Sequence, residues 1–218
     1  MSVNSIIQIA SIPNREAMLK KTVESLRPQG SIFVALNGYR AVPDFLGEGE
    51  YVMLDNSRGD AAKFYDIERH EGYLFTCDDD LIYPPDYCEY MRQGVDKYGC
   101  PCTLHGKIYD KPIRAFNIIK LQMQCLQDAF GDGRVDVGGT GVMAWHSSQV
   151  KISYDQFKSR NMADLWFAKT CTEQGVKIMC LEHKRGQLAY QGPHDTIWQQ
   201  EKNKGFTEQT ALLKTFLK

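Results

Sequence analysis

Short apolar runs alternate with helical patterns through the first half of the chain, and this alternation limits the fold more than any other feature of the sequence. Each run has the length of a buried strand, and the segments between the runs carry apolar residues at helical spacing or contain chain-breaking proline and glycine. Strands joined by helical crossovers build an α/β protein. The expected strands are residues 6–12, 31–36, 51–54 and 72–77, and the expected helices are residues 15–26 and 60–69.

The second half of the chain is less regular. Residues 118–126 fit either a helix or a strand, and the glycine-rich residues 135–145 are expected to be extended. Helices are expected over residues 85–98 and 162–174, strands over residues 102–108 and 176–181, and an amphipathic stretch at the end of the chain. Since there is no repeat and no linker, the 218 residues predict a single domain over residues 1–218.

Composition excludes several classes of protein. Lys and Arg number 26 against 27 Asp and Glu, so no basic excess favours a nucleic-acid partner. The longest apolar runs fall far short of the roughly 20 residues that a membrane span needs. The first residues lack the pattern of a signal peptide, and the seven cysteines follow no disulfide rhythm. We therefore expect a cytoplasmic protein with reduced cysteines and no integral membrane segment.

Three consecutive carboxylates, Asp78, Asp79 and Asp80, follow a predicted buried strand. Open α/β sheets bind their ligands at the carboxyl ends of their strands. Because side chains alternate there, Asp78 and Asp80 point the same way, as oxygen ligands that suit Mg²⁺ or Mn²⁺ bridged to phosphate. The alternative is a solvated acidic turn that caps the next helix.

Five segments in this order and spacing resemble the GT-A fold of nucleotide-sugar glycosyltransferases of the Asp-x-Asp type. They are residues 11–15, 58–63, 74–80, 138–141 and 162–165, and the resemblance extends roughly from residue 6 to residue 198. It implies a Rossmann-like, mixed central sheet flanked by helices. It also implies a nucleotide-binding half over residues 1–100 and an acceptor half over residues 101–218 with a C-terminal lid.

The same resemblance implies a UDP-sugar donor and a bound Mn²⁺ or Mg²⁺. Asp80 would bind the cation directly, and Asp78 would reach the cation through water or contact the ribose. Asp79 would point the other way and brace the nucleotide site. Of the two late histidines, His194 is preferred slightly over His183 as an added metal ligand, although a lone histidine is more often a packing residue.

Nucleotide contacts are implied for five further residues: Ser11, Arg15, Asn37, Asp60 and Lys63. Ser11 would line the base, and Arg15 would lie near the phosphates or a carboxylate. Asn37 stands where family members often carry an aspartate, but Asn37-Gly38 also fits a turn. Asp60 and Lys63 lie one helical turn apart, so they could contact ribose or phosphate or form a surface ion pair.

On the acceptor side, Gly138, Gly139 and Thr140 would line the donor sugar and the acceptor, and Trp145 could stack on a sugar ring. The alternatives are a tight turn and core packing. Asp164 matches the acidic residue of the Glu-Asp motif and would accept the proton of the attacking hydroxyl, which favours inversion. If Asp164 only hydrogen-bonds a sugar, retention stays open, and it could also only stabilise its helix.

The sequence therefore predicts transfer of a hexose-type residue from a UDP-sugar to a glycan acceptor on protein or lipid. The enzyme would act in the cytoplasm or peripherally at a membrane surface, and a viral origin would place it in the host cytoplasm. One alternative is a sugar-phosphate nucleotidyltransferase, although residues 11–15 lack its glycine-rich loop. The other is a non-catalytic nucleotide-sugar-binding module. A zinc site at Cys100, Cys102 and His105 lacks a nearby fourth ligand.

Overall fold

A central sheet of eight strands forms the middle layer of the computed structural model, which describes residues 4–192, 202 and 205–217. Its strand order is β3-β2-β1-β4-β11-β6-β12-β9. The strands are β1 Ser5–Ser11, β2 Ser31–Asn37, β3 Tyr51–Leu54, β4 Tyr73–Asp78, β6 Cys102–Thr103, β9 Gly133–Val135, β11 Val142–His146 and β12 Ile178–Cys180. Strands β1 to β4 run parallel, whereas β11 is antiparallel to both of its neighbours, so the sheet is mixed.

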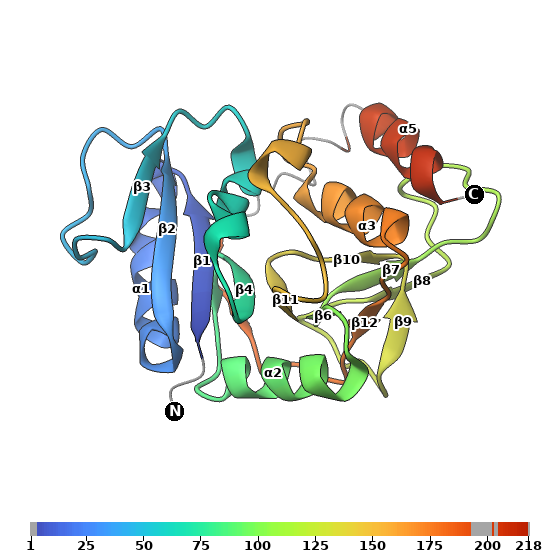
Figure 1. Ribbon diagram of the computed structural model, residues 1–218, viewed down its shortest axis with the longest axis horizontal. Coiled ribbons are helices and arrows are strands. Elements are labelled where there is room, and N and C mark those ends of the chain that lie inside the picture. The colour runs from blue at the N-terminus through green and yellow to red at the C-terminus, as the bar shows by residue number, and fades with distance from the viewer. Residues whose placement is uncertain (1–3, 193–201, 203–204, 218) are drawn as a thin grey trace.

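Helices cover both faces of this sheet (Figure 1). Helices α1 (Glu16–Leu26) and α2 (Tyr87–Tyr98) pack on one face, and α3 (Ala163–Glu173) and α5 (Thr207–Phe216) pack on the other. The alternation within β4 explains the division, because Leu74 faces the α3 side while Phe75 and Cys77 face the α1 side. The predicted α/β fold with a mixed central sheet flanked by helices is confirmed.

Several expected elements take a different form. The helix predicted over residues 60–69 is a pair of 3-10 helices, η3 Gly59–Phe64 and η4 Ile67–Arg69. They are separate because Asp66 between them has a left-handed backbone, with a φ of 54°. Shorter 3-10 helices are η1 Pro13–Arg15, η2 Arg27–Gln29 and η5 Tyr154–Gln156.

Two small sheets flank the central one. The strand predicted over residues 102–108 divides between sheets, because residues 102–103 belong to the central sheet and β7 (Gly106–Ile108) lies in a three-stranded sheet. Its neighbours are β10 (Val137–Gly138) and β8 (Leu121–Met123). The second small sheet pairs β5 (Leu81–Ile82) with β13 (Ala189–Tyr190).

Trp145 belongs to the core, so its predicted contact with a sugar ring is wrong in this structure. It is 0% exposed and lies on the α3 face of β11, with its ring 5.0 Å from that of Phe167 and 5.9 Å from that of Phe64. Alternation along β11 directs Trp145 into this layer.

All seven cysteines are free, as predicted. Within residues 4–192 and 205–217, no helix has the length and apolarity needed to cross a bilayer.

Candidate functional site

The acidic triplet lies where the parallel strands end. Ala10 of β1 pairs with Asp78 of β4, and Ser11 pairs with Leu36 of β2, so the carboxyl ends of these three strands lie at one edge. Tyr83 supports the end of β4, because its hydroxyl donates to Gly141 O at 2.5 Å and accepts from Asp78 N at 2.8 Å. The prediction that the triplet stands at a ligand-binding edge is consistent with this topology.

Asp79 turns inward and braces the edge, as the alternation of side chains indicated. Its carboxylate accepts a hydrogen bond from Ser11 Oγ at 2.6 Å and from an Arg15 guanidinium nitrogen at 2.9 Å. Ser11 and Asp79 are both buried, so neither side chain is open to a nucleotide in this structure. In this structure Ser11 braces Asp79 and does not line a nucleotide base, since the two buried side chains satisfy each other's hydrogen-bonding groups.

Arg15 connects the inner and outer carboxylates. Besides Asp79, its guanidinium reaches Asp80 at 3.2 Å. Burial, followed by the neighbouring charges of Asp78 and Asp79, raises the pKa of Asp80 to about 7, although Arg15 opposes this rise. A single arginine therefore does not neutralise the triplet.

Lys63 forms the second cationic contact, through an ion pair with Asp78. The lysine side chain is 3% exposed, whereas that of Asp78 is 45% exposed. Burial opposes the charge of Lys63, but Asp78 and Asp60 outweigh this effect and raise its pKa. Lys63 is held in place by η3, whose Ala61 and Ala62 are buried beside it. The two alternatives for Lys63 thus resolve into a buried ion pair with the triplet.

Asp60 is half-buried, and among the described residues it forms no ion pair. Its Oδ2 accepts a hydrogen bond from Ala163 N at 3.3 Å, and its Oδ1 is buried without a hydrogen-bond partner among the described residues. Burial raises the pKa of Asp60 to about 7, with Lys63 opposing and Asp164 and Asp78 adding to the rise. Asp60 therefore ties the first turn of α3 to the acidic edge.

Asp164 stands on that first turn, near the triplet. Its Oδ1 accepts hydrogen bonds from Thr140 N and Thr140 Oγ1, both at 2.7 Å. Over the part of the chain that is described, its Oδ2 has no hydrogen bond or ion pair. Thr140 is buried, so it positions Asp164 in this structure and is not open to a sugar. A carboxylate with one fixed and one open oxygen is suited to accept a proton.

The glycines of residues 138–141 have different surroundings, some in the core and one at the acidic triplet. A Cβ at Gly138 would come within 2.8–3.2 Å of Met143, Ile178 and Thr103, and a Cβ at Gly139 would stand 2.9 Å from His105 Cβ. Gly138 thus serves core packing, which corrects its assignment as a sugar contact. Gly139 allows its strand to approach His105. The glycine in contact with the triplet is Gly141, where a Cβ would overlap the Asp78 carboxylate.

Asn37 lies under η3 and is 3% exposed. Its Nδ2 donates to Gly59 O at 3.0 Å, and its buried Oδ1 has no partner in the described part of the chain. The residue is therefore more than a turn former, and its contact with a nucleotide base stays a prediction.

Two basic residues beside Asp164 were not predicted for this site: no local motif marks Lys107, and His105 was considered only as a zinc ligand. Burial lowers the pKa of Lys107, while Asp164 opposes this effect. Burial, followed by the charge of Lys107, lowers the pKa of His105 to about 4, so His105 is neutral near pH 7. Tyr83 was also not predicted to support the triplet, and Gly141 was noticed only as part of the glycine segment of residues 138–141.

The residues predicted to bind a metal ion have different outcomes in the structure. Among residues 4–192 and 205–217, no three or more His, Cys, Asp or Glu side chains are grouped so as to hold a metal ion, the suggested zinc site included. Asp78 and Asp80 would therefore need ligands from a diphosphate or water. His194 lies outside the described residues. His183 is buried, with its ring nitrogens 2.8 Å from Leu181 O and 3.0 Å from Gln124 O, which is a packing role.

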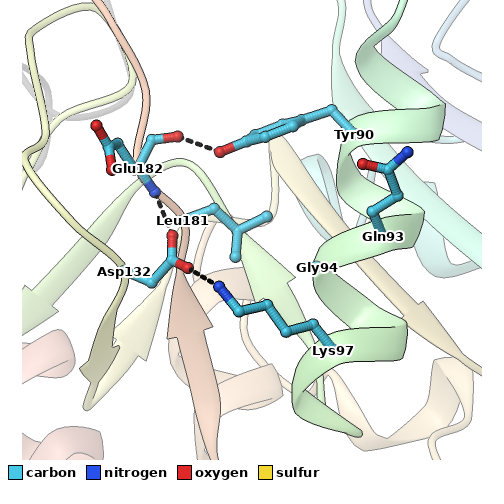
Figure 2. A pocket seen from close by; sticks show the side chains of 7 residues that line it. All are labelled: Tyr90, Gln93, Gly94, Lys97, Asp132, Leu181 and Glu182. Atoms are coloured by element: carbon cyan, nitrogen blue, oxygen red, sulfur yellow. Dashed lines mark hydrogen bonds and ion pairs between the residues drawn. The ribbon is translucent and has the colours of Figure 1, made fainter.

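A hollow of about 280 Å³ lies away from this chemistry, between α2 and the chain after β12 (Figure 2). Asp132 accepts from Lys97 Nζ and from Glu182 N, each at 2.8 Å, and Tyr90 donates to Glu182 O. A second hollow, of about 310 Å³, is lined by Tyr73, Pro85 and Arg92, among others. Because the principal polar groups of the first hollow are already paired, we assign it no function.

Solved structures match the fold, whereas no family model and no curated protein matches the chain. A crystal structure of S. aureus TarS 1–349 matches with a TM-score of 0.53 at 12% identity, covering 83% of this chain and 58% of that one. The same protein in complex with UDP-GlcNAc gives a TM-score of 0.48 at 12% identity, covering 83% and 56%. The inositol-1-phosphate CTP transferase from T. maritima gives 0.47 at 13% identity, covering 99% and 97%.

With a TM-score of 0.53 at 12% identity, the match to TarS 1–349 shows a shared fold and nothing finer. The chain spans less than two thirds of the length of TarS 1–349. What the site does must therefore be argued from its own residues.

Proposed function

We propose that the protein is a metal-dependent glycosyltransferase that moves a hexose-type residue from a UDP-sugar to a hydroxyl of a glycan acceptor. The observation that carries the proposal is the arrangement of charge at one sheet edge. Asp78 and Asp80 stand beside Lys63 and Arg15, and Asp164 faces the same edge from α3. A carboxylate pair for a cation and a separate carboxylate for a proton are the two elements that metal-dependent transfer with inversion would use.

The excess of negative charge supports a cation at this edge. Five aspartates, residues 60, 78, 79, 80 and 164, act on one another there, and two cations, Arg15 and Lys63, are paired with the triplet. A diphosphate would be repelled by such a site. A divalent cation would remove the repulsion and would also favour the ionised form of Asp80.

The donor set fits Mn²⁺ or Mg²⁺. Mg²⁺ is usually bound through one or two carboxylates with phosphate oxygens and water completing its shell, which agrees with two available aspartates. Asp80 and Asp78 would hold the ion, and it would stabilise the negative charge that develops on the leaving diphosphate. Lys63 and Arg15 orient these carboxylates, and Asn37 Oδ1, which is buried under η3 in this structure, would accept from a base N–H only after η3 moved away from it.

Asp164 is the proposed general base. The hydrogen bonds from Thr140 fix one oxygen of its carboxylate and leave the other to accept the proton of the acceptor hydroxyl. A base on the opposite side of the anomeric carbon from the leaving group favours inversion. The acceptor is a glycan on protein or lipid, and the site of action is the cytoplasm or a membrane surface. The fold likeness to TarS, which has been solved with UDP-GlcNAc, agrees with a UDP-sugar donor.

Thermal shift measurements with UDP, GDP, CMP and UDP-sugars, each with and without Mn²⁺, test the nucleotide and metal assignments. We expect a shift with UDP that requires the metal and disappears in Asp80→Ala. At a ligand concentration about 100-fold above Kd, the stabilisation is about 2.7 kcal/mol. The matched control is Asp44→Ala, because Asp44 is exposed. A shift without metal, or a preference for GDP, would overturn the assignment.

Product analysis separates the reaction classes. Release of UDP from a UDP-sugar above background supports glycosyl transfer. Pyrophosphate release from UTP and a sugar 1-phosphate would instead identify a nucleotidyltransferase. Metal-dependent UDP binding without either product would identify a non-catalytic binding module.

A further inference from the structure

Lys107 is a buried cation for which the proposed reaction has no use. The residue lies on β7 between β10 and β8, where it pairs in register with Val137 and Gln122. It is 8% exposed, and burial lowers its pKa. An ammonium group in such a place has lost most of its water.

No anion within the described chain forms an ion pair with this ammonium. The ammonium stands 4.3 Å from the centre of the Phe116 ring, and the described residues give it no hydrogen bond or ion pair. Asp164 acts on Lys107 through space without forming an ion pair with it. A cation–π contact offsets only part of the cost of removing an ammonium from water.

The neighbouring polar groups add donors but no charge. Gln122 Nε2 lies 3.1 Å from His105 Nε2. A neutral imidazole has one donor and one acceptor nitrogen, and in the tautomer whose Nε2 accepts from the Gln122 amide, that amide keeps a second hydrogen. The surroundings of Lys107 thus offer an ammonium and the amide of Gln122 on the neighbouring strand, and Asp164 is close enough to act on the ammonium through space.

We propose that Lys107 binds an anionic group, a phosphate or a carboxylate, of the molecule that reacts beside Asp164. The inference rests on the proposed function, because that function makes Asp164 the place where donor sugar and acceptor meet. The anion has two sources: a uronic acid as the transferred sugar, or a phosphorylated acceptor. Either would pair with the ammonium, which explains why a costly charge is kept at this position.

Two pairs of probes distinguish the sources. The donor arm compares UDP-glucuronic acid with UDP-glucose in the presence of Mg²⁺, by calorimetry. The acceptor arm compares glucose 6-phosphate with glucose, by NMR titration of the ¹⁵N-labelled protein. This arm is repeated with inorganic phosphate alone, so that it needs no nucleotide. We expect the anionic probe to bind at least tenfold more tightly than the neutral one in one of the two arms.

The variants assign the preference to this residue. Lys107→Met should abolish the preference and leave the affinity for UDP unchanged, whereas Lys107→Arg should retain part of it. Lys20→Met is the matched control, because Lys20 is exposed on α1. Lys107→Gln replaces the methionine variant if circular dichroism shows that the latter does not fold.

The proposal is overturned if neither anionic probe is preferred by the wild type, or if the preference survives in Lys107→Met. It is also overturned if Lys107→Met loses UDP itself, because the lysine would then belong to the nucleotide site. Metal-dependent UDP binding without any anion preference would contradict this inference alone and leave the proposed function standing.

Discussion

Gly141 and Asp78 lie so close together that the Asp78 carboxylate occupies the space of a Cβ at position 141. The two residues are also joined through their backbones, because Asp78 N donates to Gly141 O at 3.1 Å. Tyr83 holds the same carbonyl from the other side. The position of the outer carboxylate therefore depends on the absence of a side chain one strand away.

Gly141→Ala should displace the Asp78 carboxylate and break its ion pair with Lys63. We expect metal-dependent UDP affinity to fall at least tenfold, as measured by calorimetry, with the fold retained. The comparison variant is Gly47→Ala, where the nearest atom to a new Cβ is Glu50 Oε2 at 3.4 Å, at the end of a flexible side chain. Equal UDP affinity in the two alanine variants would contradict this account of Gly141.

Lys63→Met should destabilise the protein, because it leaves Asp78 and the half-buried Asp60 without their cation. Removing one partner of a buried ion pair lowers the free energy of unfolding by about 3–5 kcal/mol. Because Asp78 is partly exposed, we expect a loss of about 3 kcal/mol. Urea unfolding measures it. The double variant Lys63→Met with Asp78→Asn should recover part of the loss. No recovery would show that the lysine contributes through packing alone.

The fold could be predicted in those segments whose secondary structure is determined by one local sequence pattern. The strands that end at Ser11, Asn37 and Asp78 were predicted correctly, because a short apolar run bounded by turn-forming residues is typical of a buried strand. The prediction of one helix over residues 60–69 was wrong, because Asp66 has a left-handed backbone. An aspartate in the sequence does not by itself reveal that conformation. The division of residues 102–108 between two sheets depends on partners distant in the sequence.

The site could be predicted less fully. Alternation after β4 correctly separated Asp79 from its two neighbours, because it is a local property. Whether Ser11, Thr140 and Trp145 face a ligand or the interior depends on what packs against them, and all three are buried. Lys107 was missed for the same reason, because only the assembled sheet brings it beside Asp164.

The pKa of Asp60 makes stability depend on pH. Its value is about 7 in the folded protein against an ordinary 3.8, so between about pH 4 and pH 7 the folded state holds a proton that the unfolded chain has released. The free energy of unfolding therefore falls as pH rises through this window. A pKa rise of this size changes the free energy of unfolding by about 4 kcal/mol at most across the window.

Asp60→Asn should remove this dependence. We expect the variant to gain stability relative to wild type as pH rises from about 4 to 7, as measured by urea unfolding at several pH values. Asp80 shifts in the same direction, but it is present in both proteins and largely cancels in the comparison. A constant difference between variant and wild type across this range would show that Asp60 is ionised when folded.

Asp164→Asn tests the proposed base. The asparagine can still accept the two hydrogen bonds from Thr140 but cannot take a proton. General base catalysis is typically worth about 10²–10⁴-fold, so kcat for UDP release from a UDP-sugar should fall by that factor. Metal-dependent UDP affinity should change much less than kcat, because in the described part of the chain the Asp164 carboxylate is hydrogen-bonded to Thr140 and acts on the acidic edge only through space. The exposed Asp44→Asn serves as the control.

Three results of this experiment have different meanings. A fall in kcat alone supports proton transfer by Asp164. A fall in donor affinity with kcat preserved would make Asp164 a sugar-binding residue and reopen retention of configuration. A lower Tm with both kinetic constants preserved would limit its role to the first turn of α3, where a carboxylate stabilises the helix. Thr140→Val adds a graded test: it removes one of the two donors that fix Asp164, so its effect on kcat should have the same sign and be smaller.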